Sequence, residues 1–594
     1  MPSVDPSANL LAPLWRHAET TPDKPLLAYR VEDRFVDVSA REVADTVRRL
    51  AAGLIGLGVQ PGERVALISH TRIEWTYLDY AIQAAGAVTV PIYETSSPDQ
   101  IEWILQDSGA VALFVEATDH EAAVKQIADR LPQLRHTFVI ELGGLESLMA
   151  QGTSVRSGAV EERVADVGAD DLATLIYTSG TTGMPKGCML THRNLLFDVA
   201  ATSEALDDIF AEGDSTLLFL PLAHSFAKTV ALVMIERGVR MGYATDVDHL
   251  LEEFPMLQPT FVVAVPRVFE KVFNKAQHKA ITEGKGKIFA MAARAATDYS
   301  RAQVGGRIGL WTRLRHALFD KLVFGKLRAV FGGQLRYAAS GGAPLGERLG
   351  HFFNGIGVTI LEGYGLTETS PVITVNRPDS LGVGTVGKPL PDTEVRIAED
   401  GEVLCRGPQV FVGYWNNEAA TREVIDPDGW FHTGDLGELD EQGRLRITGR
   451  KKDLIVTAGG KNVAPAILED RLRGHPLISD SLVVGDQRPF IGALIALDAE
   501  ALPVWAEEHG KAGRDSAELL TDPDLHEIVV QAVTEANQAV SRAEQIRKVA
   551  LLPRDFTIAG GELTPTMKVR RMVVASEYAP LIEDLYQEGG ISIP

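Results

Sequence analysis

Short apolar runs alternate with longer segments of helical periodicity, and this alternation restricts the fold more than any other feature. Such runs occupy residues 64–69, 111–116, 172–178 and 261–265. A buried strand followed by an amphipathic helix is typical of the βαβ unit, in which parallel strands are covered by helices. We therefore predict an α/β fold whose large N-terminal part has parallel-type sheets flanked by helices.

The chain is long enough for several domains. Its 594 residues exceed the size of an ordinary domain, about 150 residues, several-fold. From about Thr385 the pattern changes to short strands with Gly and Asp turns, which predicts a β-rich layer. Strand and helix patterns mix again further on, including a helix expected around residues 524–543. We predict an N-terminal domain at 1–449, a hinge at 450–453 and a small mobile α+β domain at 454–594.

The composition excludes several classes of function. Lys and Arg total 58 against 80 Asp and Glu, and the net charge of −22 repels nucleic-acid backbones, so no nucleic-acid partner is expected. The apolar content of 45% indicates a soluble globular protein. Cys188 and Cys405 form no C-x-x-C pattern, which argues against a disulfide framework and favours the reducing cytoplasm.

Two segments lack the pattern of a targeting or membrane-spanning element. The N-terminus lacks the basic and apolar regions of a secretory signal. The most apolar window, Thr216–Ile235, contains a proline, a histidine and a lysine that a spanning helix would have to bury in hydrocarbon. We therefore expect this window to lie in the core.

A loop rich in glycine and hydroxyl groups follows the apolar run 172–178. Residues 179–187, SGTTGMPKG, combine three glycines, three hydroxyl residues and Lys186. Backbone N–H groups and hydroxyls in such a loop can surround phosphate oxygens while the lysine supplies positive charge. Pro185 stands where a Walker A motif requires glycine. The sequence therefore predicts a phosphate-binding loop of another class.

The string YTSGTTGMPKG resembles the signature loop of the adenylate-forming superfamily, which contains acyl-CoA synthetases, peptide-synthetase adenylation domains and beetle luciferases. Further matches follow in family order over nearly the whole chain: LPLAHSF (220–226), SGGAPL (340–345), EGYGLTET (362–369), GWFHTGD (429–435), ITGRKKD (447–453), TAGGKNVAP (457–465) and LTPTMK (563–568). The segment VPRVFEKV (265–272), with the long helical insertion after it, resembles bacterial long-chain fatty acyl-CoA synthetases.

This resemblance implies roles for individual residues. It places His224 beside the acyl carboxylate, Thr367 at the α-phosphate and Glu368 on Mg²⁺, with Lys186 and Lys568 as further catalytic groups. The residues implied to bind ATP or AMP are Thr178, Ser179, Gly180, Thr181, Thr182, Gly183, Gly341, Gly342, Ala343, Tyr364, Gly365, Asp435 and Arg450. By itself, Asp435 would be interpreted as a turn residue, and SGGAPL and EGYGLTET as loops at strand ends.

The resemblance also implies a domain rotation between two half-reactions. Lys452 occupies the hinge position, where many family members have Asp. After pyrophosphate leaves, the small domain is expected to withdraw Lys568 and to present Gly459, Gly460 and Lys461 to coenzyme A.

The implied activity is ATP-dependent activation of a long-chain fatty acid to acyl-AMP and transfer to coenzyme A, with Mg²⁺. The products would be acyl-CoA, AMP and pyrophosphate. The alternatives are a luciferase-like oxidase, a stand-alone fatty acyl-AMP ligase and an acyl-CoA synthetase for a medium-chain or aryl acid. A non-catalytic nucleotide- or lipid-binding protein is disfavoured, because it should have lost one of Lys186, Glu368, Asp435 and Lys568, and all four are present.

One segment differs in charge from the rest of the chain. Residues 267–335 contain 14 Lys and Arg against 4 Asp and Glu, a net charge of +10, so the remainder carries −32. Apolar residues recur there at helical spacing, namely Trp311, Leu314, Leu318, Phe319, Leu322 and Val323, with Arg313, His316, Asp320 and Lys321 mostly opposite. This pattern predicts peripheral contact with an anionic membrane through 267–335. A core-packed helix with a solvated basic face, or a patch for the phosphates of coenzyme A, explains it equally well. The oligomeric state is not indicated.

Overall fold

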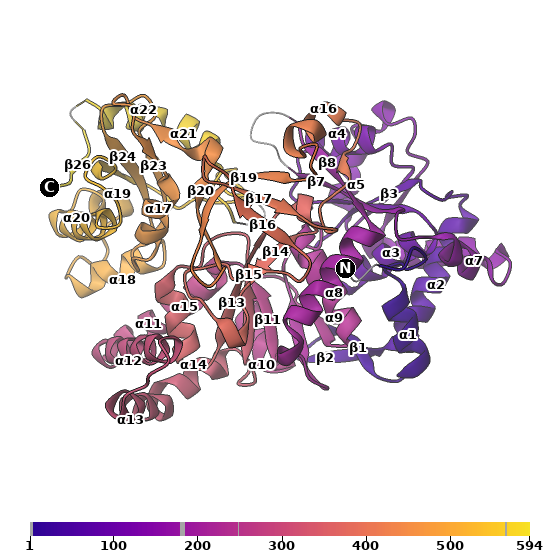
Figure 1. The fold of residues 1–594 in the computed structure, drawn as a ribbon, viewed down its shortest axis with the longest axis horizontal. Coiled ribbons are helices and arrows are strands. Elements are labelled where there is room, and N and C mark those ends of the chain that lie inside the picture. The colour runs from indigo at the N-terminus through magenta and orange to yellow at the C-terminus, as the bar shows by residue number, and fades with distance from the viewer. Residues whose placement is uncertain (1–3, 179–183, 248, 565–566, 588) are drawn as a thin grey trace.

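The structure is a computed structural model that describes residues 4–178, 184–247, 249–564, 567–587 and 589–594 (Figure 1). The predicted phosphate contacts Ser179, Gly180, Thr181, Thr182 and Gly183 lie outside these residues.

A nine-stranded sheet forms one half of the N-terminal part. Its order is β15-β14-β13-β12-β11-β9-β10-β1-β2, and the strands from β13 to β1 are parallel to their neighbours. The strands are β1 (Pro25–Val31), β2 (Arg34–Ser39), β9 (Ser215–Leu218), β10 (Arg240–Tyr243), β11 (Phe261–Ala264), β12 (Tyr337–Ser340), β13 (Thr359–Gly365), β14 (Val372–Val375) and β15 (Lys388–Pro389). Their apolar residues face helices on both sides, as the near-continuous apolar runs predict.

A seven-stranded sheet forms the other half, in the order β18-β8-β7-β4-β3-β5-β6. The strands from β7 to β6 are parallel, and β8 and β18 add antiparallel edges. Its strands are β3 (Arg64–Ile68), β4 (Val88–Ile92), β5 (Ala112–Val115), β6 (His136–Val139), β7 (Leu172–Thr178), β8 (Lys186–Thr191) and β18 (Gly413–Tyr414). The α/β class with largely parallel sheets is therefore confirmed.

Helices cover the two sheets. They are α1 (Ala12–Thr20), α2 (Ala40–Gly56), α3 (Ile73–Ala84), α4 (Pro98–Ser108), α5 (Thr118–Lys125), α6 (Gly144–Gln151), α7 (Ala159–Asp166), α8 (His192–Ala205), α9 (Ser225–Arg237), α10 (Leu250–Leu257) and α15 (Glu347–Gly355). Helix α2 shows how the sequence sets such a helix. The Ser39 side chain accepts a hydrogen bond from the Glu42 backbone, and the Glu42 carboxylate accepts from the Ser39 backbone, so the two residues cap the helix reciprocally.

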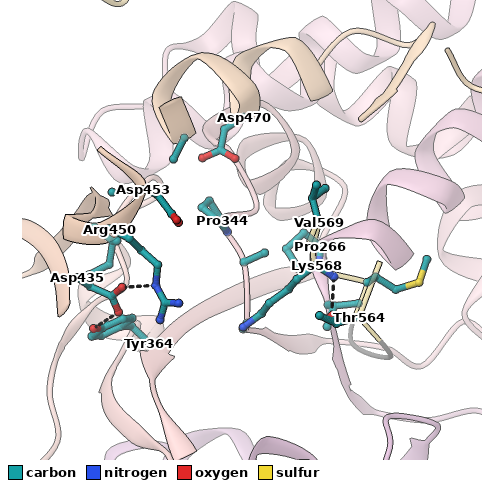
Figure 2. A pocket seen from close by; sticks show the side chains of 18 of the residues that line it. Pro266, Pro344, Tyr364, Asp435, Arg450, Asp453, Asp470, Thr564, Lys568 and Val569 are labelled. Atoms are coloured by element: carbon teal, nitrogen blue, oxygen red, sulfur yellow. Dashed lines mark hydrogen bonds and ion pairs between the residues drawn. The ribbon is translucent and has the colours of Figure 1, made fainter. Parts of the chain in front are cut away.

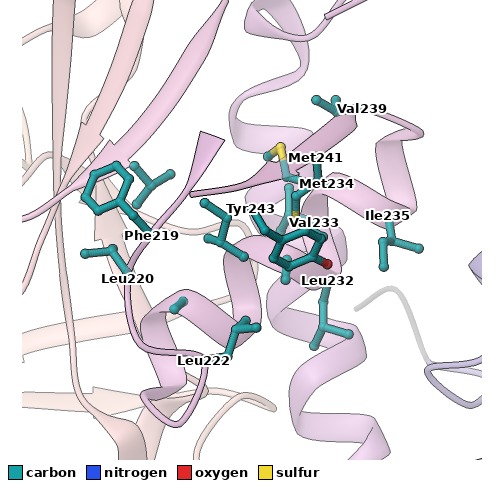
Figure 3. Packing of buried hydrophobic residues seen from close by; sticks show 14 of the residues in the cluster. Phe219, Leu220, Leu222, Leu232, Val233, Met234, Ile235, Val239, Met241 and Tyr243 are labelled. Carbon is teal, nitrogen blue, oxygen red and sulfur yellow. The ribbon is translucent and has the colours of Figure 1, made fainter. Parts of the chain in front are cut away.

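The window Thr216–Ile235 lies in the core, as expected, and forms β9 and most of α9. Figure 3 shows side chains of α9, among them Leu232 and Met234, packed against Met241 and Tyr243 of β10. Burying a side chain of this size stabilises the fold by roughly 1.5–3 kcal/mol. The lysine of this window, Lys228, is buried as well.

The predicted β-rich layer is present as an antiparallel sheet in the order β16-β17-β19-β20. Its strands are β16 (Glu394–Ile397), β17 (Glu402–Arg406), β19 (Phe431–Leu439) and β20 (Leu445–Arg450). Asp435 therefore lies inside a strand, opposite Arg450 of β20, and not in a turn. In Figure 1 this layer lies between the two large sheets and the C-terminal part.

The C-terminal part has its own sheet, in the order β23-β24-β25-β26, and its own apolar clusters. Its elements include α17 (Pro465–Arg473), β23 (Ile478–Val484), β24 (Ile491–Leu497), α18 (Ala501–Glu508), α20 (Pro523–Asn537), β25 (Ile546–Leu552), α21 (Arg571–Glu577), α22 (Ala579–Leu585) and β26 (Ile591–Ser592). The predicted helix at 524–543 ends earlier, because the Asn537 side chain bonds to both backbone groups of Ile546 and turns the chain into β25.

The basic segment forms a helical projection at one end of the molecule (Figure 1). It consists of α11 (Pro266–Thr282), α12 (Gly286–Val304), α13 (Leu310–Phe319), a π-helical turn (Asp320–Phe324) and α14 (Gly325–Val330). Helix α12 packs on α15, and α13 packs on α12. Within the described residues, no helix is both long and apolar enough to cross a bilayer.

Candidate active site

The described motif residues from the signature strand to Lys568 line one cavity of about 2660 Å³. Those that line it are Thr178, Lys186, His224, Gly341, Gly342, Ala343, Tyr364, Gly365, Thr367, Glu368, Asp435, Arg450, Lys452 and Lys568. Ordinary ligand pockets measure about 300–1,000 Å³, so this cavity has room for more than one substrate. The fold therefore gathers residues from both halves of the chain at one place.

Lys186 and Glu368 both contact the side chain of Tyr414. The Tyr414 hydroxyl donates to Glu368 Oε1 at 2.8 Å, and Lys186 Nζ lies 5.1 Å from the centre of the same ring. Lys186 is positioned because β7 and β8 pair Thr178 with it. This arrangement places a cation and a carboxylate at the cavity wall, close to the end of β7. Tyr414 was not singled out in the sequence, because its partner is 46 residues away.

Asp435 is held by two neighbours. The Tyr364 hydroxyl donates to Asp435 Oδ2 at 2.7 Å, and Arg450 Nε donates to Oδ1 at 2.6 Å (Figure 2). Burial, and next the Asp435 charge, raise the pKa of Tyr364, which therefore stays a donor. Tyr364 was expected in a loop, but β13 continues through Gly365 because it pairs there with β14.

Gly365 permits a close passage of the chain at this strand end. A Cβ atom on it would lie 1.6 Å from the Pro371 carbonyl oxygen. No side chain fits there, so the loop that carries Thr367 and Glu368 can follow the strand directly. Thr367 is buried, and its hydroxyl lies 3.1 Å from that of Ser225.

His224 stands at the start of α9 and faces the cavity. Its Nδ1 accepts a hydrogen bond from the Phe226 backbone at 3.1 Å. Desolvation, with repulsion from Lys568, lowers the pKa of His224 to about 3. The ring is therefore neutral at physiological pH, and Nε2 carries the proton that it can donate.

Lys568 reaches the same cavity from the C-terminal part. In Figure 2 its side chain extends toward the side that carries Asp435 and Arg450. Its Cε lies 3.8 Å from the position that a Cβ on Gly342 would occupy, so the SGGAPL loop forms the adjacent wall. Desolvation, and next repulsion by Arg450, lower the pKa of Lys568. The ammonium group thus lies where an anion would stabilise it.

The predicted hinge and coenzyme A residues occupy different places. Lys452 lies in a short 3₁₀ turn, Lys451–Asp453, directly after β20, and it lines the cavity. Gly459, Gly460 and Lys461 lie in the turn between β21 (Ile455–Val456) and β22 (Asn462–Val463). Of the described residues lining the cavity, none comes from this turn. In this arrangement Lys568 faces the cavity and the TAGGKN turn does not.

A charged cluster connects the C-terminal part with α11. Arg267 donates to Asp480 at 2.6 Å and to Asp555 at 3.4 Å, and Arg473 donates to the second Asp480 oxygen at 3.3 Å. Arg267 belongs to the VPRVFEKV segment, but its partners lie far away in the sequence. Nothing in the sequence alone indicated this contact.

An apolar extension of the cavity runs along one face of α9. Phe226, Val230, Val233 and Met234 line it from this helix. Leu206, Phe210, Phe261 and Val263 line it from neighbouring segments. From Phe226 to Met234, eight steps of 1.5 Å make this wall about 12 Å long. It begins at Phe226, two residues after His224, and can contact an apolar chain along its length.

The comparisons with known proteins agree with this geometry. The family model "AMP-binding enzyme" matches residues 14–415, and the model of the AMP-binding enzyme C-terminal domain matches residues 452–589. The chain therefore belongs to the AMP-binding enzyme family. The long-chain-fatty-acid–CoA ligase FadD15 of Mycobacterium bovis is 51% identical over 98% of this chain and 97% of its own.

More distantly similar proteins show how widely the fold is shared. The peroxisomal long chain acyl-CoA synthetase 7 of Arabidopsis thaliana is 31% identical over 93% of this chain and 82% of its own. The solved A domain of a carboxylic acid reductase from Segniliparus rugosus, in complex with AMP and a co-purified carboxylic acid, superposes with a TM-score of 0.76. It is 22% identical and covers 98% of this chain and 95% of its own, so this similarity shows the fold alone.

Proposed function

We propose that this AMP-binding enzyme is a long-chain fatty-acid–CoA ligase that works through an acyl-AMP intermediate. The observation that carries the proposal is the single cavity in which His224, Glu368, Asp435 and Lys568 meet, with an apolar extension beginning beside His224. The similarity to long-chain-fatty-acid–CoA ligases over nearly the whole chain supports the same activity.

The reaction has two steps. A carboxylate oxygen of the fatty acid attacks the α-phosphorus of ATP, and the bond to pyrophosphate breaks. The thiol of coenzyme A then attacks the acyl carbon, AMP leaves, and the thiol proton passes to solvent. The first step brings anionic groups together, so it needs positive charge, whereas the second needs access for a thiol.

We assign the first step to the residues that surround the cavity. The protonated Nε2 of His224 would donate to the fatty-acid carboxylate and orient it. Lys568 and Lys186 would neutralise charge on the carboxylate and phosphates, and Thr367 would contact the α-phosphate. Removing such a charge contact typically costs about 3 kcal/mol of transition-state stabilisation.

The nucleoside is assigned to the strand-end loops and to the β-rich layer. Asp435 would accept hydrogen bonds from the ribose hydroxyls, while Arg450 holds it in place from β20. Tyr364 and the backbone of Gly341, Gly342 and Ala343 would flank the adenine. Thr178 and Gly365, which also line the cavity, would make the remaining nucleotide contacts.

The donor set fits a magnesium ion that ATP brings with it. Mg²⁺ is usually held by one or two carboxylates together with substrate phosphates and water. Glu368 offers one such carboxylate, fixed by Tyr414, and no group of three or more His, Cys, Asp or Glu side chains among the described residues forms a separate metal cage. The ion would supply charge neutralisation for the phosphates when bound.

For the second step we propose a rotation of residues 454–594 about the hinge 450–453. The supporting observation is that Lys568 faces the cavity, whereas the turn with Gly459, Gly460 and Lys461 does not line it. Rotation would exchange the two, and the glycines would allow the pantetheine to approach the backbone. Lys452 lies where the torsion change would occur.

The apolar wall along α9 supports an aliphatic acid, because about 12 Å exceeds the length of a short acid or a single aromatic ring. The similarity to long-chain-fatty-acid–CoA ligases supports the preference for a long chain. A cytoplasmic location remains a prediction, supported by two thiols, Cys188 and Cys405, that are both free and buried.

The test of the proposal is pyrophosphate release by the purified protein with ATP, Mg²⁺ and saturated fatty acids of increasing chain length, with and without coenzyme A. We expect turnover to be highest with long chains and to require coenzyme A for multiple cycles. Release that peaks with medium-chain or aryl acids would contradict the chain-length assignment. Multiple turnover without coenzyme A, with free acyl-AMP as product, would identify a stand-alone acyl-AMP ligase.

A further inference from the structure

The projection formed by α12 and α13 carries a concentration of exposed apolar side chains. Eight of the eighteen exposed large hydrophobic side chains among the described residues lie between Ile288 and Leu322. Trp311, which is 83% exposed, is the most exposed of all of them. Scattered exposed apolar residues are ordinary in proteins, whereas a contiguous group marks an interaction surface.

The apolar side chains of α13 lie on one side of the helix. At about 100° per residue, positions 310, 311, 314 and 318 fall within an arc of roughly 100°. The π-helical turn continues the same side to Leu322. We call the exposed side chains of Leu310, Trp311, Leu314, Leu318 and Leu322 the α13 stripe.

The opposite side of α13 is anchored to the protein, which corrects the face expected from the sequence. Phe319 is buried, and Val323 packs against the core, so neither belongs to the exposed face. His316 stacks on Tyr299 with ring centres 3.8 Å apart, and its Nε2 lies 2.6 Å from the Gly355 carbonyl oxygen. These contacts fix which side of the helix faces outward.

Basic side chains flank the α13 stripe on both sides. Arg313 lies along one side of it by helical position and Arg315 along the other, while Lys321 lies near its end, in the π-helical turn. All three are exposed, and Arg315 forms an ion pair with Asp298 of α12. Arg307 and Lys326, at the two ends of the segment, are exposed as well.

We propose that the α13 stripe docks this protein on the surface of an anionic phospholipid bilayer. A short helix with exposed Trp and Leu on one face and Lys and Arg beside them suits the boundary between headgroups and acyl chains, where it lies parallel to the surface. Lys and Arg near an anionic surface are each attracted to it. Because the rest of the chain carries −32, it would be repelled, so docking is restricted to this end of the molecule.

The alternative occupants fit this surface less well. The phosphates of coenzyme A would require convergent donors in a concave site, whereas none of residues 310–322 lines the cavity. A protein partner would leave the basic flanks on both sides of an apolar stripe unexplained, unless that partner were itself acidic and apolar.

The first experiment measures co-sedimentation of the full-length protein with vesicles, without substrates. Vesicles of phosphatidylcholine with 30% phosphatidylglycerol are compared with pure phosphatidylcholine at about 0.05 and 0.5 M NaCl. We expect binding to the anionic vesicles at low salt and at least tenfold weaker binding to neutral vesicles or at high salt. Absence of binding by the wild type at low salt would overturn the proposal.

Two variants separate the apolar and the charged contributions. W311S/L314S/L318S removes three side chains of the α13 stripe, and R313E/R315E/K321E reverses three flanking charges. Each should lower anionic-vesicle binding at least tenfold while the activity on a water-soluble medium-chain acid stays unchanged. Because the vesicle measurement involves no catalysis, its failure is distinguishable from failure of the proposed function.

Matched controls use exposed residues elsewhere in the protein. V31S/L142S/L439S and K125E/R156E/R422E change the same classes of side chain outside the projection and should bind vesicles like the wild type. An equal loss in stripe variants and controls would contradict docking through α13. A charge variant that binds vesicles normally but has a raised KM for coenzyme A would assign the basic face to coenzyme A instead.

Insertion of Trp311 provides an independent readout. We expect the tryptophan emission of the wild type to shift to the blue on addition of anionic vesicles. W311F should still bind these vesicles but should lose most of the shift. A self-associating or acidic protein partner would instead give concentration-dependent oligomers, or capture of that partner, with no shift on vesicles. Either of these results would overturn the bilayer assignment.

Discussion

Arg267 and Asp480 lie 213 residues apart in the sequence, and Arg267 Nη1 donates to Asp480 Oδ2 at 2.6 Å. This ion pair connects α11, which borders the cavity, to β23 of the C-terminal part. It therefore holds the C-terminal part in the arrangement in which Lys568 faces the cavity. If that part rotates between the two half-reactions, the pair must break each time.

Arg267→Ala should therefore impair adenylation more than thioester formation. Losing a coupling of about 1.4 kcal/mol would slow acyl-AMP formation roughly tenfold, while transfer from supplied acyl-AMP to coenzyme A stays within about twofold. Arg267→Lys, which keeps the positive charge beside Asp480 and Asp555, should recover part of the first rate. Arg315→Ala, which removes an exposed ion pair on the same projection, serves as the matched control. Equal loss in both half-reactions would argue against this positioning role.

The Tyr414 hydroxyl fixes the carboxylate that we assign to magnesium. Tyr414→Phe keeps the ring beneath Lys186 and removes only the hydrogen bond to Glu368. Second-shell hydrogen bonds typically change metal affinity or activity 10–100-fold. We expect the Mg²⁺ concentration for half-maximal adenylation to rise about tenfold, with the KM for the fatty acid unchanged. An unaltered magnesium dependence would show that the Tyr414 hydroxyl does not position the magnesium carboxylate.

Lys228 and Asp79 form an ion pair inside the core. Lys228 Nζ donates to Asp79 Oδ2 at 2.5 Å, and both side chains are nearly inaccessible to solvent. Lys228→Met leaves the Asp79 charge buried without its partner, which should lower the free energy of unfolding by about 3–5 kcal/mol in urea denaturation. K228M/D79L should recover much of the loss. As a control, Lys125→Met breaks an exposed ion pair and should lower the free energy of unfolding by under about 1 kcal/mol. A loss this small for Lys228→Met would contradict the description of a buried ion pair.

Glu362 gives the stability a measurable pH dependence. Burial raises its pKa to about 7 from the ordinary 4.5. The folded state therefore binds more protons than the unfolded state between these values, and stability falls as the pH rises from about 4.5 to 7. The total effect is about 3 kcal/mol.

Glu362→Gln removes this titration. The free energy of unfolding should decrease from pH 5 to pH 8, and this decrease should be larger for the wild type than for Glu362→Gln. Contributions from other titrating groups, such as Glu270, are common to both proteins and cancel in the difference. Parallel pH curves would show that the Glu362 carboxyl does not titrate as described.

The sequence predicted the parts of the fold that local pattern determines. The run at 172–178 is β7 to the residue, and the β-rich layer after Thr385 is present, because strand periodicity and turn residues are encoded nearby. By itself Asp435 would be interpreted as a turn residue, yet pairing with Arg450 places it in a strand. Cross-strand pairing of this kind is decided by tertiary structure.

The other features that the sequence did not predict also depend on tertiary structure. Tyr414 contacts Glu368 only after β18 adds to the edge of the seven-stranded sheet. On α13, apolar residues occur on more than one side, and the π-helical turn shifts the helical phase. Periodicity therefore predicted the helix correctly, but Phe319 was placed on the exposed face although it is buried.

Lys568→Ala separates the half-reactions at the site itself. Acyl-AMP formation should fall at least a hundredfold, because the ammonium group is needed when carboxylate and phosphate meet. Transfer from supplied acyl-AMP to coenzyme A should be largely retained, since Lys568 is expected to have left the cavity by then. Parallel loss of both rates would refute the assignment.

The fate of the fatty-acid oxygen tests the central claim most directly. Hexadecanoic acid labelled with oxygen-18 in its carboxylate is converted by the purified protein with ATP, Mg²⁺ and coenzyme A, and the products are analysed by mass spectrometry. A route through acyl-AMP transfers one labelled oxygen to AMP and leaves pyrophosphate unlabelled, with acyl-CoA formed in equal amount. Label in phosphate together with ADP formation, or acyl-CoA without labelled AMP, would contradict the account.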